Sequence, residues 1–474
     1  MKSIYKILML IAVVLSITAC GDEFLDQTPQ QSVANELAIS TLADANIALN
    51  GCYDALQEET VLARDYYVVC DIASDNSKLR PENSGRFLSP YYWSMSPTDG
   101  YVSDFWTDTY DAINRVNNIL VKIDDLEGDD AERARIKGEA SGLRALGHLI
   151  LVNYFAQAYN ENPAGPGIPI LTEPAGVDYE PSRNTIAEVY TQILADLDIA
   201  DNNLNYTSSN LYFSKGAAKV LKSRVYLYMN DWANAKAEAE ELINSGAYSL
   251  APYELNPDEK TIAADYYINA WALDNNDESI FSIGFTTVDN QSVDMLGYMY
   301  LKSGYGDAIP TTDLMDLYSD TDMRNYWFYV DGDYTYTNKY PGLKSARPGV
   351  DNIPVARLSE AYLNAAEANF ELGDEALAIT YLDAIISRAD AAAAASIESG
   401  SALRTKILTE RRKELAFEGH RFWDLKRRGM DIVRVDRTVP NAAALIVAGS
   451  DDYAFPIPQI EINVNTNIQQ NPGY

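Results

Sequence analysis

The sequence is poor in the residues on which many enzyme active sites depend. It has only two histidines, His148 and His420, and three cysteines among 474 residues. The motifs His-Glu-x-x-His, Cys-x-x-Cys and Gly-x-Ser-x-Gly are missing, as is a glycine-rich phosphate loop. These absences argue against a zinc enzyme and a Ser-His-Asp hydrolase. His148 lies within a predicted helix, where a packing role is the favoured interpretation.

Positive charge is also scarce. Lys and Arg total 37 against 69 Asp and Glu, which gives a formal net charge of −32. Binding to nucleic acid needs many Lys and Arg contacts to phosphates, so no nucleic-acid partner is expected. An anionic membrane surface should repel the same chain, so a basic patch would not hold it there.

Cysteine usage restricts the covalent links. If Cys20 is acylated, as argued below, Cys52 and Cys70 are the only pair left to form a disulfide. We favour two buried free thiols, because a chain of this length can bury a large core and does not need a disulfide to stabilise it.

Apart from the N-terminus, no run is long and apolar enough to span a bilayer. Lys2 and Lys6 precede a short apolar run, Ile7 to Ile17, and small residues follow it. This pattern predicts a signal peptide over residues 1–19. Ile17 to Cys20 resembles a bacterial lipobox, which implies lipidation of Cys20 and a lipidated tether over residues 20–38. An ordinary signal peptide with an incidental cysteine is the alternative.

Helical periodicity covers much of the remaining chain. Apolar residues recur every three or four positions in segments at about 39–58, 101–126, 131–156, 185–203 and 402–427. Residues 218–244 and 361–387 share their length and the position of a tight turn, at Asn230-Asp231 and Gly373-Asp374. This internal repeat is typical of tetratricopeptide-like helical hairpins, with generic hairpins as the alternative. Ala235, Ala239, Ala376 and Ala378 are expected at close helix contacts, with Leu242 and Ile385 in equivalent places.

Two regions lack this periodicity. Residues 71–100 and 250–354 are rich in Asp, Asn, Gly, Pro and aromatic residues, and Ile280 to Phe285 has β character. Long irregular segments on a repeat scaffold commonly carry binding sites. The predicted fold class is therefore mostly α, a tetratricopeptide-like helical repeat scaffold at about 39–249 and 355–430, with an irregular, loop-rich, partly β insertion.

Carboxylate clusters offer the remaining routes to chemistry. Glu410, Glu414 and Glu418 recur every fourth residue among Arg411, Arg412, Lys413 and Arg421. Ion pairing and helix capping are favoured over catalysis there. The segment Asp274 to Glu278 has calcium-type oxygen ligands, but it does not match an EF-hand, and a solvated turn is favoured. No catalytic residue, metal site or cofactor is expected.

The aromatic loops are the strongest functional signal. Sugar rings stack their apolar faces on Tyr and Trp, while their hydroxyls bond to Asp, Asn and Arg. The predicted ligand-binding residues combine both types: Asp75, Asn76, Arg80, Tyr92, Trp93, Tyr298, Tyr300 and Trp327. Burial under a loop, or a protein interface, is the alternative for each of them.

Several segments in order resemble the SusD/RagB family of nutrient-binding outer-membrane lipoproteins. They are Cys20–Asp26, Trp106–Asn117, Gly138–Ala145, Asp322–Arg324, Val355–Asn369, Phe455–Val464 and Asn471–Tyr474. The most specific is Glu410–Gly429, ERRKELAFEGHRFWDLKRRG. This motif is expected to be structural and to hold the last helix against the repeats.

The resemblance implies a SusD-like body over residues 39–474 with an oligosaccharide ligand. It also implies an outer-membrane location facing the cell exterior, and a SusC-like TonB-dependent barrel as partner. A binding protein, not an enzyme, is thus expected. Three alternatives stay open: a peptide-binding member of the family, a tetratricopeptide-type lipoprotein that assembles other proteins, and a surface glycosidase with paired carboxylates.

Overall fold

The computed structural model describes residues 38–176, 178–254, 276–342, 349–437 and 442–474. The predicted signal peptide, the lipidation site Cys20 and all but the last residue of the tether lie outside these ranges. Within the described ranges, no helix combines the length and the apolar composition needed to cross a bilayer.

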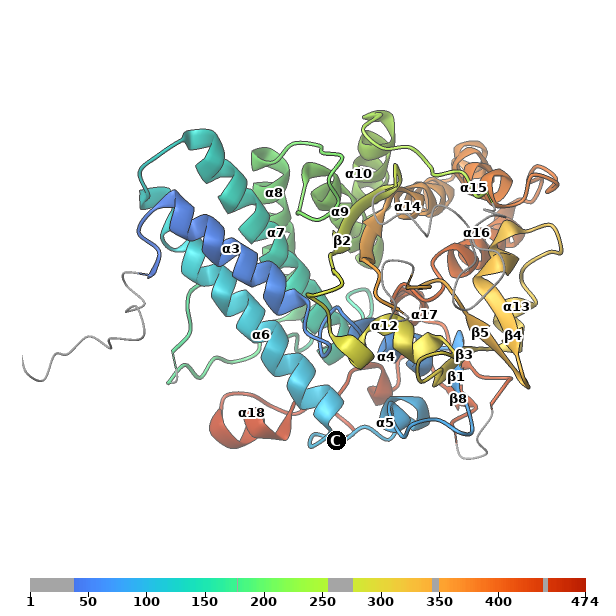
Figure 1. The fold of residues 1–474 in the computed structure, drawn as a ribbon, viewed down its shortest axis with the longest axis horizontal. Helices are drawn as coiled ribbons and strands as arrows, with labels where there is room; N and C mark the ends of the chain where they lie inside the picture. Colours follow the sequence, from blue (N-terminus) through green and yellow to red (C-terminus); the bar gives the residue numbers. More distant parts are fainter. Residues whose placement is uncertain (1–37, 177, 255–275, 343–348, 438–441) are drawn as a thin grey trace, which may run out of the picture.

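Long helices make up the scaffold. They are α3 (Leu42–Leu56), α6 (Gly100–Leu120), α7 (Asp130–Phe155), α8 (Ile186–Asn203), α9 (Lys215–Tyr228), α10 (Trp232–Asn244), α14 (Leu358–Glu371), α15 (Glu375–Ala389) and α16 (Gly400–Glu414). From α6 to α10, each helix packs against the next one in this order, and α14 to α16 continue the array (Figure 1). The predicted mostly α, tetratricopeptide-like scaffold is confirmed.

Shorter elements lie mainly along one side of the array. The helices are α4 (Asp65–Ala73), α5 (Leu88–Tyr92), α12 (Leu296–Tyr300), α13 (Thr312–Met315), α17 (Arg421–Arg427) and α18 (Gln459–Val464). The strands are β1 (Ser77–Leu79), β2 (Ser279–Ile283), β3 (Ala308–Pro310), β4 (Phe328–Asp331), β5 (Tyr334–Thr337), β6 (Ile353–Arg357), β7 (Ile432–Val433) and β8 (Leu445–Ile446). The strands form antiparallel pairs: β1 with β3, β2 with β6, β4 with β5 and β7 with β8.

The two repeats have matching turns. Asp231 and Asp374 cap α10 and α15 with nearly the same backbone angles, φ −85° and ψ 75° against φ −94° and ψ 73°. Each is preceded by a residue with positive φ, Asn230 at 59° and Gly373 at 88°. The small residues Ala235, Ala239 and Ala378 are fully buried, as expected, together with Leu242 and Ile385. Ala376 is exposed, because the cap at Asp374 turns this first-turn position to solvent.

The insertion leaves the array after α10 and returns before α14. Helices α10 and α14 nevertheless pack directly against each other, so the intervening segment is accommodated beside the array instead of within it. The predicted β-like run becomes β2, which pairs with β6 at the point of return. The other irregular region contains more structure than expected, since it holds the end of α4, then β1 and α5.

The prediction of one helix over 402–427 is wrong in its middle. Helix α16 ends at Glu414 and α17 begins at Arg421. Phe417 and Gly419 between them have positive φ, 65° and 71°. The break turns the chain back, so that the buried Phe417 and Phe422 reach the main hydrophobic core on both sides of it.

Cys52 and Cys70 are buried free thiols, as predicted. Burial raises the pKa of Cys52 to about 12 and raises that of Cys70 as well. Both belong to the main hydrophobic core, which runs through the array without a cross-link between them.

Candidate ligand-binding face

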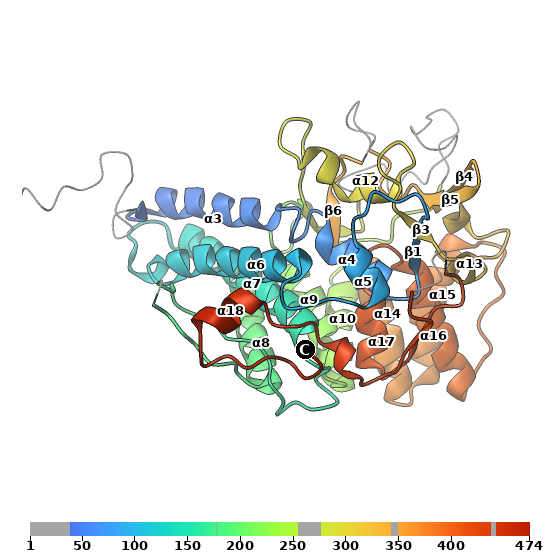
Figure 2. The same cartoon turned by 90° about the horizontal axis from the view of Figure 1, so that it is seen from below.

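Three irregular segments come together beside the array: residues 74–93, 296–310 and 328–337. Strand β1 pairs with β3 so that Ser77 faces Pro310, and the Arg80 N–H continues the ladder to the Asp307 carbonyl at 2.9 Å. Figure 2 shows α4, α5 and β1 next to α12 and β3. We call this surface the loop face.

Arg80 fixes the centre of the loop face. Its Nε donates to the Gly306 carbonyl at 3.2 Å, and its Nη2 donates to the Tyr305 carbonyl at 3.1 Å. The guanidinium also lies 5.9 Å from the centre of the Tyr334 ring. Arg80 is half-buried, so the prediction that it faces the binding surface is compatible with the structure, although two of its donors are already used.

A pair of tyrosines stands beside Arg80. The rings of Tyr298 and Tyr305 are 6.1 Å apart and tilted, and the Tyr298 carbonyl accepts N–H bonds from Tyr305 and Gly306. A Cβ on Gly304 would lie 2.6 Å from the same carbonyl oxygen, so this tight loop needs glycine there. Arg86 lies 4.1 Å above the Tyr305 ring and donates to its hydroxyl at 3.2 Å. Tyr298 and Tyr305 are both half-buried.

Tyr92 and Trp93 lie at the end of α5, and both are half-buried. Trp93 has a positive φ of 54°, which ends the short helix and turns its indole toward Phe422, 5.6 Å away between ring centres. The Tyr92 ring is 5.7 Å from that of Tyr91. The rings of Tyr92 and Trp93 therefore pack partly against other side chains and stay partly exposed at the surface.

Asp75 and Asn76 are buried beneath the loop face, contrary to their predicted role as ligand contacts. Arg421 holds Asp75 through two contacts of 2.7 and 2.8 Å, and Arg412 donates to the Asn76 side-chain oxygen at 2.9 Å. Burial would raise the pKa of Asp75, but Arg421 and Arg412 hold it below its usual value. These residues support the loop face and do not line it.

Tyr300 and Trp327 are also buried, with 0% and 1% of their surface exposed. The Tyr300 hydroxyl donates to Asp71 at 2.7 Å. The Lys339 ammonium lies 3.9 Å above the Trp327 ring. The prediction that these two rings stack on a ligand is therefore not supported, because protein groups already cover them.

Sequence reasoning did not single out Tyr305, Tyr334 and Arg86 as site residues. Tyr298, Tyr300 and Tyr305 lie in one short aromatic segment, and no local pattern separates the buried ring from the half-exposed ones. Tyr300 is buried because the single turn of α12 directs it into the core. The glycine-rich loop after α12 brings Tyr305 back beside Tyr298, so these two rings stay half exposed.

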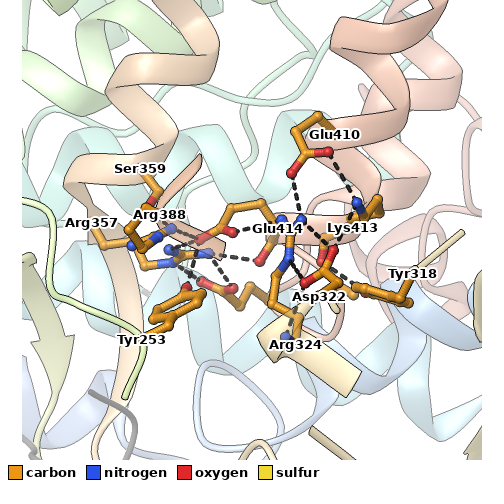
Figure 3. Close-up of polar contacts among 12 residues, drawn as sticks. Tyr253, Tyr318, Asp322, Arg324, Arg357, Ser359, Arg388, Glu410, Lys413 and Glu414 are labelled. Atoms are coloured by element: carbon orange, nitrogen blue, oxygen red, sulfur yellow. Dashed lines mark hydrogen bonds and ion pairs between the residues drawn. The ribbon is translucent and has the colours of Figure 1, made fainter. Parts of the chain in front are cut away.

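The glutamates of the Glu410–Gly429 segment form buried ion pairs, as predicted. Figure 3 shows those of Glu410 and Glu414. Glu414 contacts Arg357 at 2.6 Å, Arg388 at 2.5 Å and Arg324 at 2.9 Å. Burial would raise the Glu414 pKa, but these three guanidiniums hold it well below its usual value. Such a carboxylate is a permanently ionised structural anion.

The other two glutamates are held in the same way. Glu410 pairs with Arg324 at 2.6 Å and with Lys413 at 3.2 Å. Glu418 pairs with Lys339 at 2.5 Å and Arg357 at 2.7 Å. Most of these partners come from the insertion and its return, and not from the neighbouring basic residues of the motif.

His148 is structural as well, and the calcium-type segment is described only in part. His148 is fully buried, and its Nε2 accepts the Leu171 N–H at 3.1 Å, while burial lowers its pKa to about 3. Asp274 and Asn275 of the calcium-type segment lie outside the described residues, and Glu278 is bound to Arg357 and Arg388. Among the residues that the structure describes, no cluster of His, Cys, Asp and Glu could hold a metal ion.

The fold is a helical-repeat scaffold that carries the loop face beside its array of helices. The family model described as "SusD family" matches residues 317–474, and the one described as "Starch-binding associating with outer membrane" matches residues 23–227. SusD-like protein P2 of Formosa agariphila is 26% identical, with 99% of each chain covered.

Solved structures agree with this result. A protein from Bacteroides vulgatus, assigned as a sugar-binding protein, is 32% identical, with a TM-score of 0.83 over 92% of this chain and 99% of its own. A SusD superfamily protein from Bacteroides thetaiotaomicron is 31% identical, with a TM-score of 0.83 over 91% of this chain and all of its own. This chain belongs to the SusD family.

Proposed function

We propose that this protein is a cell-surface lipoprotein that binds oligosaccharides at the loop face and delivers them to a SusC-like TonB-dependent barrel in the outer membrane. The observation that carries the proposal is the pairing of half-exposed rings with fixed polar groups. Tyr298 and Tyr305 stand beside Arg80 and Arg86, and backbone hydrogen bonds hold the loop between them.

Rings and cations in this arrangement suit a sugar. Each stacked aromatic contact contributes about 1 kcal/mol, and the hydroxyls of the sugar can bond to the donors that remain on Arg86 and to the exposed Glu82. The family description of starch binding and the sugar-binding assignment of the Bacteroides vulgatus relative support the same class of ligand.

Affinity electrophoresis in gels containing amylopectin, xylan, laminarin, levan or mannan tests the ligand class. We expect at least one polysaccharide to retard the full-length protein. Tyr298→Ala and Trp93→Ala should weaken that retardation, while Tyr179→Ala, which removes a ring that is 51% exposed outside the loop face, should not. Unchanged retardation in both loop-face variants would remove these rings from the site.

The lipid anchor is tested separately. Labelled palmitate should be incorporated into the wild-type protein and not into Cys20→Ala. Absence of the label from the wild-type protein would refute the proposed lipid anchor. The barrel partner should copurify with the wild-type protein from detergent-solubilised outer membranes. Because we propose a binding protein and not an enzyme, incubation with the retarding polysaccharide should release no reducing sugar.

A further inference from the structure

A hollow lies away from the loop face, between α3, the linker from α8 to α9 and the end of β2. It consists of two adjoining parts of about 950 and 910 Å³, which share Asn50, Ser209 and Tyr212 as lining residues. We call the two parts together the Tyr212 groove. Each part taken alone lies within the size range of typical small-molecule sites.

Tyr212 stands where the two parts of the groove meet. Its ring is 49% exposed and contacts Tyr53 at 5.6 Å with an interplanar angle of 85°. Tyr53 is itself fixed, because its hydroxyl donates to Glu139 at 2.7 Å and accepts the Phe213 N–H at 2.8 Å. The exposed ring is thus mounted on a rigid support.

The linker that carries Tyr212 is fixed to β2. The Ser282 N–H donates to the Asn210 carbonyl at 2.7 Å. A Cβ on Gly284 would lie 2.8 Å from a methyl carbon of Leu211, so glycine at this position allows the linker to approach the strand closely. The wall of the groove is therefore formed before any ligand arrives, which lowers the ordering cost of binding.

Neutral amide side chains are a large part of the polar lining, among them Asn46, Asn50, Gln57 and Asn210. An amide both donates and accepts hydrogen bonds, as a sugar hydroxyl does. Within the part of the chain that the structure describes, the side chains of Asn50, Ser208 and Asp289 have no hydrogen-bond partner, so they are available to a ligand.

The charges around the groove disfavour an anionic ligand. Arg135, which lines it, is neutralised by Glu139 at 2.5 Å and Glu132 at 2.8 Å. Asp54 and Asp289 add exposed negative charge at the other end. A neutral polyhydroxylated ligand fits this balance better than a sulfated or uronic-acid chain.

We infer that the Tyr212 groove is a second saccharide-binding site, which takes neutral sugar units of a longer glycan. The inference rests on the proposed function for its ligand class, but not on the loop face for its residues. Two sites on one rigid body would increase the avidity for a long chain that reaches both, without changing the affinity for a short one.

The test uses the same polysaccharide gels with the full-length protein. We expect Tyr212→Ala to weaken the retardation by a retarding polysaccharide about five-fold, the factor for one lost ring contact. Tyr212→Trp should restore it, because a ring platform is retained, and Tyr179→Ala serves as the matched control. Tyr212 is half exposed, so the thermal melting of the alanine variant should match that of the wild type.

The outcomes separate the two proposals. If Tyr298→Ala weakens binding and Tyr212→Ala does not, the proposed site in the Tyr212 groove is overturned and the one at the loop face is supported. If only Tyr212→Ala weakens binding, the site in the groove is supported and the one at the loop face is overturned. If none of the five polysaccharides retards the wild-type protein, both are overturned. Equal losses in Tyr212→Ala and Tyr212→Trp would also contradict the groove, since a ring should rescue binding.

Discussion

Arg357 and Glu418 bind each other through two parallel contacts, Nε to Oε2 at 2.7 Å and Nη2 to Oε1 at 2.9 Å. Arg357 ends the last strand of the insertion, and Glu418 lies just beyond the last long helix of the array. The same guanidinium contacts Glu278 and Glu414, each at 2.6 Å. This one side chain therefore connects the residue before β2 and the end of β6 to the end of α16.

Glu414→Ala should destabilise the protein strongly. The substitution leaves Arg324, Arg357 and Arg388 buried with one carboxylate fewer, and breaking a buried ion network from one side costs about 3–5 kcal/mol. Denaturation by urea measures the loss. Glu398→Ala, which removes an outlying pair with Lys406 at 2.9 Å, is the control and should cost at most about 1 kcal/mol. Similar losses in the two variants would refute the structural role of Glu414.

Gly419→Ala should be more harmful than Gly429→Ala. Both glycines have positive φ, 71° and 57°, so alanine costs about 1 kcal/mol of backbone strain at either position. A Cβ on Gly419 would also lie 2.7 Å from a ring carbon of the buried Tyr66, whereas nothing lies within 4 Å at Gly429. Overpacking adds about 1–3 kcal/mol at Gly419 alone. Equal melting temperatures for the two variants would contradict this difference.

Asp71→Asn should stabilise the protein more at pH 8 than at pH 5. Burial raises the Asp71 pKa from 3.8 to about 7, so the folded protein binds this proton more tightly than the unfolded chain. The stability that this carboxyl contributes is present below pH 3.8 and is lost as the pH rises to about 7. Asparagine avoids the loss and keeps an acceptor for the Tyr300 hydroxyl.

The advantage of Asp71→Asn over wild type should thus grow by about 2.6 kcal/mol between the two pH values, as measured by urea denaturation. Burial shifts the pKa of Asp65 to about 6 and that of Lys426 to about 7, but both groups titrate in the variant as in the wild type, so the comparison cancels their contribution. An advantage that does not depend on pH would show that Asp71 does not titrate as described.

Arg80→Lys should weaken polysaccharide binding about three- to ten-fold with little change in stability. Lysine cannot reproduce the fork that reaches the carbonyls of Tyr305 and Gly306 at once, so the loop carrying Tyr305 loses its support. Titration calorimetry with the retarding polysaccharide measures the affinity. Arg404→Lys, at an exposed pair with Glu371, is the matched control.

Hydrogen exchange separates positioning by Arg80 from direct contact with the ligand. If Arg80 holds the loop, the amides of residues 302–307 should exchange faster in Arg80→Lys without any ligand present. Lost affinity with unchanged exchange would instead assign Arg80 to direct ligand contact.

Local features of the sequence predicted the scaffold well. The helices at 39–58, 101–126, 131–156 and 185–203 could be predicted because apolar residues recur every three or four positions along each of them, and the matching turns at Asp231 and Asp374 revealed the repeat. The helix α4 was not predicted. All of its residues are buried, so it lacks the polar face that makes a helical period visible.

The site was predicted less well, for a related reason. Asp75, Asn76, Tyr300 and Trp327 have the composition of ligand contacts, yet Arg421, Arg412, Asp71 and Lys339 occupy them from distant parts of the chain. Likewise, the side chains that contact the Glu414 carboxylate lie 26 to 161 residues away in sequence. Residue type shows what a side chain can bind, but long-range packing decides what it does bind.

The sequence by itself determined the helical repeats, the family, the two unpaired thiols and the structural nature of the Glu410–Gly429 segment. The repeats, the family and the Glu410–Gly429 segment depend on local spacing or on an ordered motif, and the free thiols follow from the size of the core that a chain of this length can bury. Only the tertiary structure decided which rings reach the surface, and it alone brought Tyr212 together with α3 and β2 to form a groove. Exposure and enclosure depend on which distant segments pack against a residue, and no local pattern encodes that.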